Sequence, residues 1–342
     1  MGDDQQPSGG AKIPREEDRP GPTVSAVICT RGRPDLVVRA IASLLGQDVH
    51  EVLVVDNAPE DDRTRLMIGD RFPDVRYVVE PVRGLDFARN RALREATGDV
   101  VAFLDDDAVA APGWAAALAD VFETDARVGA CTARVEALSI ATPAQRLFEA
   151  NGGYARGLER IRLPDDATRR LHGRRAPLIA WAVSIGSGCS FALHRRLVLE
   201  LGSFDVALDM GHPLPGGGDH DMLWRVLQAG YDVVYEPEAL AFHEHRTDEE
   251  AVYAQLAGHQ RGLVAFLAKT VVTVRGWRKV NVLVFLLWRL LKPGVRLARR
   301  AAGRDPLPAG VLWRMWGNAV IGPAAYLAAR RIARTRAAGV GQ

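Results

Sequence analysis

Three consecutive carboxylates, Asp105, Asp106 and Asp107, follow the apolar run VVAFL, which has the composition of a buried strand. Crowded carboxylates repel one another, so such a cluster persists most readily where its members share a cation. Their oxygen atoms suit Mg²⁺ or Mn²⁺, ions that bind substrate phosphates while keeping several waters. The triplet therefore favours a divalent metal site for a phosphorylated substrate, with a solvated acidic turn as the alternative.

The elements that would position this triplet alternate along the chain. Strands are expected at 24–29, 52–55, 75–79, 100–104 and 231–235, and helices at 34–45, 85–97, 112–122 and 219–230. Such an order predicts an α/β fold with a mostly parallel sheet flanked by helices. In sheets of this kind, ligands bind beyond the carboxyl ends of the strands.

Polar residues occur at the strand ends where that rule expects a site. Thr30 and Arg31 follow the first strand, Asp56 and Asn57 follow the second, and the acidic triplet follows the fourth. An ordinary polar loop is the alternative at each position. Further along, the Gly/Ser-rich stretch IGSGCSFALH suggests close backbone packing or a strand that lines a ligand.

The cysteines and the N-terminal segment bear on the compartment. The three cysteines are far apart and form no CxxC pair, so a disulfide framework or a zinc site is not expected and a reducing cytoplasm fits best. Residues 1–22 are polar and rich in Pro and Gly, which predicts a disordered tail without a secretory signal. No apolar run approaches the ~18 residues of a membrane-spanning helix.

The formal charge of +2 conceals a strong asymmetry, because residues 259–342 hold sixteen Lys and Arg against one acid, Asp305. Four of the seven tryptophans are also in this segment. A basic stripe recurs there at helical spacing: Arg289, Lys292, Arg296 and Arg299. Basic faces with interfacial aromatic residues are typical of helices that lie on an anionic membrane. A helical cap on the rest of the chain and an oligomer interface are the alternatives, and Pro293 should kink the helix.

Over residues 23–246 the chain resembles the family-2 glycosyltransferases, which adopt the GT-A fold. The resemblance rests on seven segments in the expected order: VSAVICTRGRP, VLVVDNAP, GLDFARNRAL, VAFLDDDAVAAPGW, GSGCSFALHRRLVLELGSFD, GGGDHDMLWRVLQAGY and VVYEPEALAFHEH. It implies inverting transfer of a sugar from a nucleotide-diphosphate donor to an acceptor hydroxyl, with Mn²⁺ or Mg²⁺ as cofactor. The acceptor would be a glycan or a lipid-linked molecule, in cell-envelope or exported glycan assembly at the inner face of the membrane.

The resemblance also implies roles for single residues on the donor side. Asp105 and Asp107 match the DxD element: Asp107 would bind the metal, and Asp105 would contact the ribose or the metal. The other donor-binding candidates share strand ends or the ARN segment: Thr30, Arg31, Asp56, Asn57, Arg89, Asn90 and Asp106.

On the acceptor side, Asp219 matches the catalytic aspartate, although Gly218 stands where the family usually has glutamate. The dipole of a helix N-terminus would by itself favour Asp219 and Asp221.

His243 matches a histidine that reaches the metal. His245 is a second candidate because residues i and i+2 of an extended segment point the same way.

The expected organisation is thus a tail at 1–22, a GT-A catalytic domain at 23–258 and a basic helical region at 259–342. A metal-dependent nucleotidyltransferase is an alternative, but the segment CTRGRPDL lacks the Gly-rich phosphate loop of that class. A nucleic-acid-binding protein that uses the basic tail is another, but the tail carries no recognisable binding module, so no nucleic-acid partner is expected.

Overall fold

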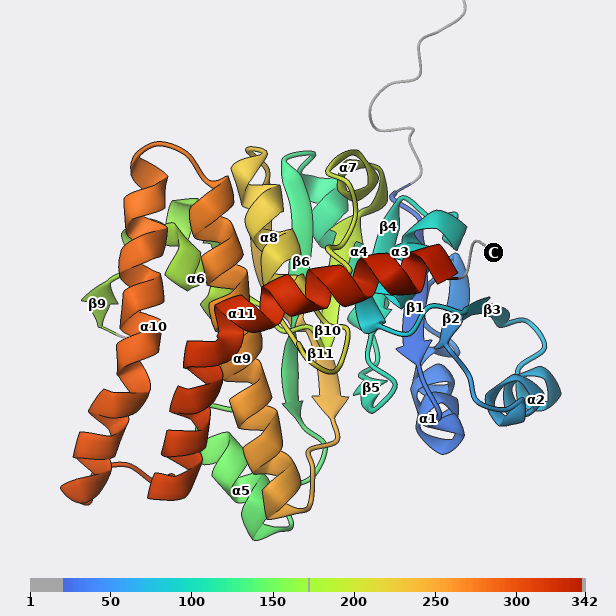
Figure 1. Ribbon diagram of the computed structural model, residues 1–342. Helices are drawn as coiled ribbons and strands as arrows, with labels where there is room; N and C mark the ends of the chain where they lie inside the picture. Colours follow the sequence, from blue (N-terminus) through green and yellow to red (C-terminus); the bar gives the residue numbers. More distant parts are fainter. Residues whose placement is uncertain (1–20, 172, 340–342) are drawn as a thin grey trace, which may run out of the picture.

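The computed structural model describes residues 21–171 and 173–339, so the predicted tail at 1–22 lies almost wholly outside the described residues. A single large sheet forms the centre of the molecule (Figure 1). Its strands follow the spatial order β3-β2-β1-β4-β10-β6-β11-β5, and β7 pairs with β11. Their bounds are β1 Val24–Thr30, β2 Glu51–Asn57, β3 Arg76–Glu80, β4 Val100–Leu104, β5 Ala108–Ala110, β6 Val128–Ala137, β7 Ile161–Leu163, β10 Ser190–His194 and β11 Asp232–His243.

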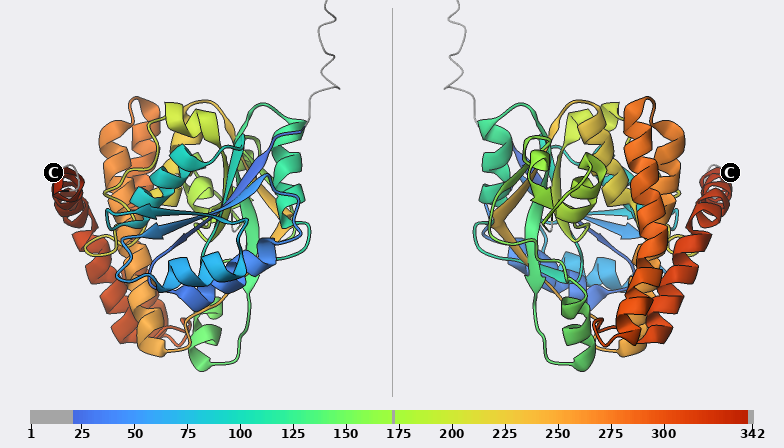
Figure 2. Two further views of the ribbon diagram at one scale, coloured as in Figure 1. Left: turned by 90° about the vertical axis from the view of Figure 1, so that its right-hand side faces the viewer. Right: turned by 90° about the vertical axis from the view of Figure 1, so that its left-hand side faces the viewer.

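Helices cover both faces of this sheet (Figure 2). Side chains that alternate along each strand divide between two cores: Val27 and Leu53 pack on the face of α3, α6 and α8, whereas Ile28 and Val54 pack on the face of α1, α2 and α4. Because both faces are buried, the strands read as continuous apolar runs. The helices are α1 Pro34–Leu44, α2 Arg63–Arg71, α3 Leu85–Glu95, α4 Trp114–Thr124, α5 Pro143–Ala150, α6 Leu178–Ile185, α7 Arg195–Glu200 and α8 Gly218–Gln228. A two-stranded sheet of β8 (Arg170–Leu171) and β9 (Arg174–Arg175) lies apart from the main sheet.

Every expected element is present, and the predicted fold class is confirmed. Strands β3, β2, β1 and β4 are parallel, while β10 runs antiparallel to β4 and to β6. The largest difference is β11, which continues to His243, past the expected end at 235. Its pairing with β6 shifts register between Glu236 and Leu240, around Pro237, and this irregularity hides the second half of the strand from a reading by periodicity.

The C-terminal part of the chain forms three long helices, α9 (Glu249–Thr273), α10 (Trp277–Ala301) and α11 (Ala309–Gly339), which pack on one another beside the sheet. The expected boundary between 258 and 259 falls inside α9. Helix α10 continues through Pro293, the residue at which the sequence analysis expected a kink. Proline cannot donate to the carbonyl of Arg289, four residues earlier, and the side-chain Nε2 of Gln260 donates to that oxygen instead, at 3.1 Å.

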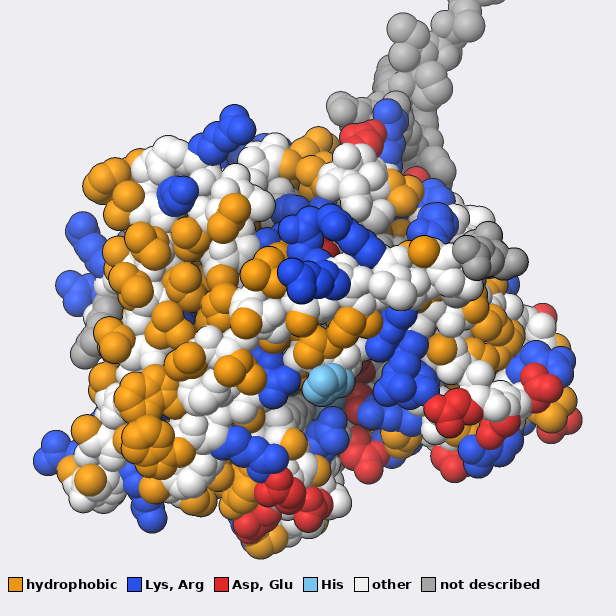
Figure 3. Space-filling view, viewed as in Figure 1, with side chains coloured by type: hydrophobic (Ala, Val, Ile, Leu, Met, Phe, Trp, Pro, Cys, Tyr) orange, Lys and Arg blue, Asp and Glu red, His pale blue; other side chains and the backbone are white. Residues whose placement is uncertain are grey.

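The basic stripe of α10 does not face outward as predicted. Arg289, Lys292 and Arg296 line an internal cavity, and only Arg299 of the four lies on the exposed surface. The outer face of the helix is apolar instead and forms a broad hydrophobic surface together with α11 (Figure 3). Among the described residues, no helix combines the length and the hydropathy needed to cross a bilayer.

Candidate active site

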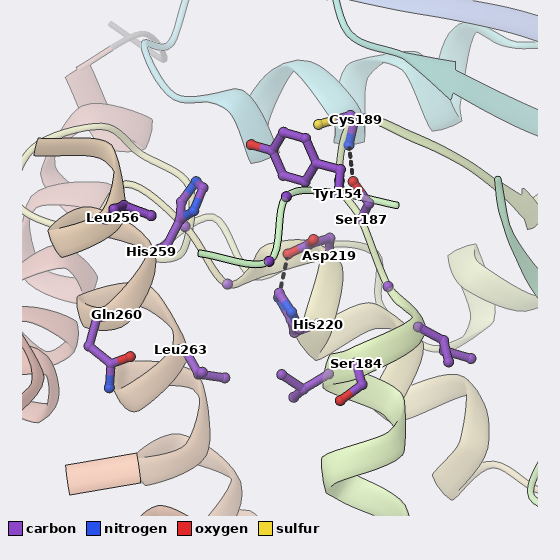
Figure 4. Close-up of a pocket in the computed structure, with 18 of the residues that line it drawn as sticks. Tyr154, Ser184, Ser187, Cys189, Asp219, His220, Leu256, His259, Gln260 and Leu263 are labelled. Atoms are coloured by element: carbon purple, nitrogen blue, oxygen red, sulfur yellow. Dashed lines mark hydrogen bonds and ion pairs between the residues drawn. The ribbon is translucent and has the colours of Figure 1, made fainter. Parts of the chain in front are cut away.

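A cavity of about 810 Å³ opens at the carboxyl end of β4, between the sheet, α8, α9 and α10. The loop at 186–189 forms one wall of it. Figure 4 shows Asp219 at its centre, with Tyr154, Ser187 and Cys189 on one side and α9 on the other. A Cβ at Gly188 would lie 3.1 Å from the Asp219 carboxylate and 3.3 Å from the Arg89 guanidinium, so the predicted close packing of this glycine-rich stretch is present.

Arg89 and Asp105 join Asp219 on the wall of the cavity nearest the sheet, which we call the acidic wall. Arg89 is 3% exposed, and its Nη1 lies 3.0 Å from Asp86 Oδ1 and 3.4 Å from Asp209 Oδ2. Its guanidinium also stands 5.4 Å from the ring centroids of two phenylalanines, Phe191 and Phe204. With two carboxylates already paired to it, Arg89 fixes the shape of the acidic wall and adds little uncompensated positive charge.

The three aspartates of the triplet point in different directions. Asp105 faces the cavity. Asp106 turns away and accepts hydrogen bonds from Thr30 Oγ1 at 2.7 Å and Arg33 Nη1 at 3.0 Å. Asp107 Oδ2 also accepts from Arg33, at 3.2 Å, while its Oδ1 lies 3.2 Å from Nε2 of His243. Asp106 is therefore bound to Thr30 and Arg33, whereas Asp105 and the Oδ1 atom of Asp107 lie toward His243.

Ligand atoms of Asp105, Cys189 and His243 lie within 4.8 Å of one another. Asp107 is beside this group through its contact with His243. Burial and the neighbouring Asp107 raise the pKa of Asp105, which is the cost of holding carboxylates together without a cation. Two carboxylates and one imidazole fit Mn²⁺ or Mg²⁺. Cys189 is an addition that the sequence analysis missed, although it stands in the glycine-rich segment.

His245 lies next to His243, and the lining of the cavity includes neither histidine. The Nδ1 atoms of the two rings lie 3.2 Å apart, and Nε2 of His245 is 2.7 Å from Glu149 Oε1. Tyr154 also packs its ring against both imidazoles. His245 thus lies between Glu149 and His243, in contact with both.

A second group of predicted residues lies outside the cavity, at the ends of β1 and β2. Thr30 and Asp56 are direct neighbours in the sheet register. Asp56 is fully buried, with Oδ2 accepting from the Tyr77 hydroxyl at 2.8 Å and Oδ1 without a hydrogen-bond partner among the described residues. Burial raises the pKa of Asp56. Arg31 lies beside this group and pairs with Glu60 at 2.6 Å.

Both predicted asparagines hold the backbone of loops and do not line the cavity. Asn57 donates to Val82 O at 2.8 Å and accepts from Gly84 N at 2.8 Å, which fixes the entrance to α3. Asn90 donates to Phe204 O at 3.0 Å and accepts from the same residue's N–H at 2.8 Å. Because the amide of each is occupied at both ends, these side chains position the site from outside it.

Asp219 is the second residue of α8 and is paired with the next residue, His220, whose Nδ1 lies 2.9 Å from Asp219 Oδ1. Burial alone would raise the pKa of Asp219, but the adjacent His220 lowers it below the ordinary range. For His220 the pair acts the other way: burial would lower its pKa, and Asp219 raises it. The sequence analysis missed His220, although it stands between the two aspartates of the segment DHD.

The fold and the acidic wall define a class of protein: an α/β protein with one large central sheet and a carboxylate-lined cavity at the ends of its strands. The model of the family described as "Glycosyl transferase family 2" matches residues 25–202, more than half of the chain. The chain therefore belongs to glycosyltransferase family 2, as the sequence motifs predicted.

Relatives with names agree with that family. The chain is 29% identical over 230 residues to a pre-mycofactocin glycosyltransferase of Mycobacterium tuberculosis, a match that covers 66% of this chain and 43% of that protein. It is 28% identical over 242 residues to a succinoglycan biosynthesis protein of Rhizobium meliloti, covering 67% and 69%. The chain thus spans less than half the length of the mycobacterial relative.

Among solved structures, the protein is similar to a mannosyltransferase from Pyrobaculum calidifontis in complex with GDP-Man and Mn²⁺. The TM-score is 0.55 at 20% identity, and the match covers 92% of this chain and 90% of that one. At this identity the likeness establishes the GT-A fold.

Proposed function

We propose that this protein is an inverting glycosyltransferase that moves a sugar from a nucleotide-diphosphate donor to an acceptor hydroxyl, with Mn²⁺ or Mg²⁺ as cofactor. The observation that carries the proposal is the acidic wall, where Asp105 and Asp219 meet in one cavity although 114 positions separate them in the sequence. Family membership supports the same reaction.

On the donor side, the free Oδ1 of Asp56 suits an N–H group of the nucleobase, and the adjacent Thr30 and Arg31 would border the nucleotide. Asp105, Asp107 and His243 would hold the metal ion. Bound there, the ion would neutralise charge that develops on the diphosphate leaving group. Arg89 would keep the acidic wall in place during the reaction, and Asn57, Asn90 and Asp106 would support donor binding indirectly.

On the acceptor side, Asp219 would take the proton from the attacking hydroxyl, since its carboxylate lines the cavity and His220 lowers its pKa, which favours the charged form that can accept a proton. The hydroxyl oxygen would form the new bond to the anomeric carbon while the bond to the diphosphate breaks. One displacement of this kind inverts the anomeric configuration. His220 is a positioning residue that holds the Asp219 carboxylate in its ionised form.

Replacing His220 should change the pH dependence of the reaction. In His220→Gln the burial of Asp219 and the nearby Asp209 act without the opposing imidazole, so the pKa of Asp219 rises. Because the base works only above its pKa, the acid limb of the profile of kcat/KM against pH moves to higher pH. Arg89 and His259 face the same carboxylate and stay in place in the variant. The control is His50→Gln, which changes an exposed histidine directly before β2, at the opposite end of that strand from the site. If the acid limb of His220→Gln stayed at the pH of wild type, His220 would have no part in the mechanism.

The test of the reaction itself is a panel of sugar nucleotides, measured for binding and for hydrolysis with Mn²⁺, with Mg²⁺ and with a chelator. Metal-dependent binding of one donor supports the proposal and identifies the sugar. A pyrophosphate product from a nucleoside triphosphate and a sugar phosphate would favour a nucleotidyltransferase instead.

We propose that the protein lies on an anionic membrane surface. The proposal rests on the C-terminal helices and on the cytoplasmic location inferred from the sequence. The supporting observation is the exposed apolar face of α10, a different face from the stripe that the sequence suggested. Its exposed side chains include Trp277, Val280, Leu283, Val284, Leu287, Trp288, Leu291 and Val295, with Arg278 and Lys279 beside them. Exposed tryptophan among leucine, next to cations, suits the interface of an anionic bilayer.

Vesicle flotation tests this surface. We expect the wild type to float with phosphatidylglycerol vesicles, and the double variant Leu287→Gln/Leu291→Gln to bind about tenfold more weakly because it loses apolar area from the interface. Leu66→Gln on α2, equally exposed but distant, is the control. The alternative outcome is that the wild type does not bind vesicles, sediments as a dimer, and becomes a monomer in the double variant. That result would mean that a second copy covers this face.

A further inference from the structure

The cavity has a second charged wall opposite the acidic one, formed by Arg289, Lys292 and Arg296 of α10. We call these three residues the basic wall. Apolar side chains line the space between the two walls, among them Trp181, Leu256, Leu263 and Met315. The cavity is therefore bipolar: carboxylates stand at the sheet, and cations stand on the C-terminal helix.

The three cations differ in how far other groups already satisfy them. Arg296 is fully engaged, with two contacts to Asp305 at 2.7 and 2.8 Å and one to Asn151 at 2.7 Å. Arg289 has a single side-chain partner, Gln260 Oε1 at 2.8 Å, and its buried Nε has none among the described residues. Lys292 forms no ion pair or side-chain hydrogen bond with any described residue. Arg289 and Lys292 therefore have hydrogen-bond donors available to a ligand.

Keeping these cations together is unfavourable without an anion. Burial and the neighbouring Arg289 and Arg296 lower the pKa of Lys292 to about 8, and burial lowers that of Arg289 to about 10. Asp305 is the carboxylate that opposes the shift of Lys292, and Arg296 already occupies both of its oxygens. Buried charges persist where a partner of opposite sign compensates them.

We propose that the basic wall binds a phosphate group of the acceptor, so that the acceptor is a phosphate-bearing molecule whose hydroxyl reaches Asp219 at the other end of the cavity. This inference rests on the proposed function, which it deepens by giving the acceptor a chemical class. A Lys ammonium and an Arg guanidinium that share one ligand are a common phosphate site in proteins.

A smaller cavity of about 310 Å³ continues from the basic wall toward the surface. Lys292 and Arg296 line both cavities, and Arg299 and Arg304 add further positive charge to the smaller one. Its rim includes Trp288 and Val295, which belong to the exposed apolar face of α10. The phosphate could therefore come from a lipid, whose chain would follow this rim, or from a soluble phosphorylated sugar. The site chemistry is the same for both.

Calorimetric titration tests the site, with octyl phosphate and glucose 1-phosphate as probes and with chelator present to exclude binding through a metal ion. Wild type is compared with Lys292→Gln and Arg289→Gln. Each variant should bind the phosphate probes about tenfold more weakly, because a charged hydrogen bond to phosphate is lost. Arg71→Gln, an exposed arginine at the end of α2 and distant from the cavity, should bind like wild type. Thermal unfolding of each variant checks that it is folded.

The outcomes separate the possibilities. Tighter binding of octyl phosphate, weakened in both variants, supports the site with a lipid phosphate, whereas equal binding of both probes, weakened in both variants, supports it with a soluble one. Probe binding that neither folded variant weakens overturns the site. Metal-dependent donor binding to wild type tests the proposed function independently. If no donor bound, the basic wall would remain an anion site but would have no role in acceptor binding. If a donor bound but the phosphate probes did not depend on Arg289 and Lys292, the proposed function would stand and the phosphate site would be wrong.

Discussion

Asp219→Asn should lower the rate of sugar transfer by about 10²–10⁴-fold while leaving metal-dependent donor binding close to wild type. The substitution keeps the shape of the side chain and removes its ability to accept the hydroxyl proton. His220 would retain a hydrogen-bond partner at Oδ1, so the start of α8 should stay folded. The initial rate of nucleotide release from the donor, with water or a glycan as acceptor, measures the effect.

A matched control separates catalysis from a general loss of charge. Asp120→Asn removes an exposed aspartate on α4, far from the cavity, and should leave the rate unchanged. If folded Asp219→Asn kept a rate within about twofold of wild type, Asp219 would not be the base, since even modest acid–base catalysis exceeds that factor.

Asp107→Ala should abolish the dependence of donor binding on Mn²⁺. Its Oδ1 faces His243, beside Asp105, so the variant removes one of the two carboxylates that suit the ion. The loss should exceed the roughly 10–100-fold that removal of an outer partner costs a metal site. Titration of the donor with Mn²⁺ and with chelator gives the measurement, and wild type in chelator should match the variant in Mn²⁺.

Asp107 also holds Arg33 at 3.2 Å, so a separate variant is needed to exclude a merely structural effect. Arg33→Gln removes that contact and keeps all three proposed ligands. It should retain metal-dependent donor binding. Equal donor binding by wild type with and without metal would contradict the metal site as a whole.

Much of the site could be predicted because it depends on local pattern. Apolar runs bounded by polar residues located β1, β2 and β4, and parallel strands bring their carboxyl ends to one edge. Thr30, Asp56 and Asp105 each stand at or directly after the end of one of these strands, so the sequence predicts that they lie along the same edge of the sheet. His220 and Cys189 are also present in the quoted segments, but their positions beside Asp219 and His243 follow from the tertiary structure and not from any spacing in the sequence.

Side-chain direction within the site was outside the reach of the sequence. Asp105, Asp106 and Asp107 are identical residues in a row, yet the first faces the cavity, the second binds Thr30 and Arg33, and the third approaches His243. The turn after β4 and the groups that surround it decide these directions. Asn57 and Asn90 illustrate the same limit, because only the packed loops show that their amides bind backbone.

The sequence by itself determined the family, the strand and helix order, and the amphipathic character of α10, because these depend on residue type and on spacing along the chain. Only the tertiary structure decided which face of α10 turns inward. Periodicity identifies two faces of a helix but not what each one meets. The hydrogen-bond partners of Arg289 and Arg296, which are Asp305, Asn151 and Gln260, lie on the inner side of α10. The cations therefore line the cavity, and the apolar face of the helix is at the surface.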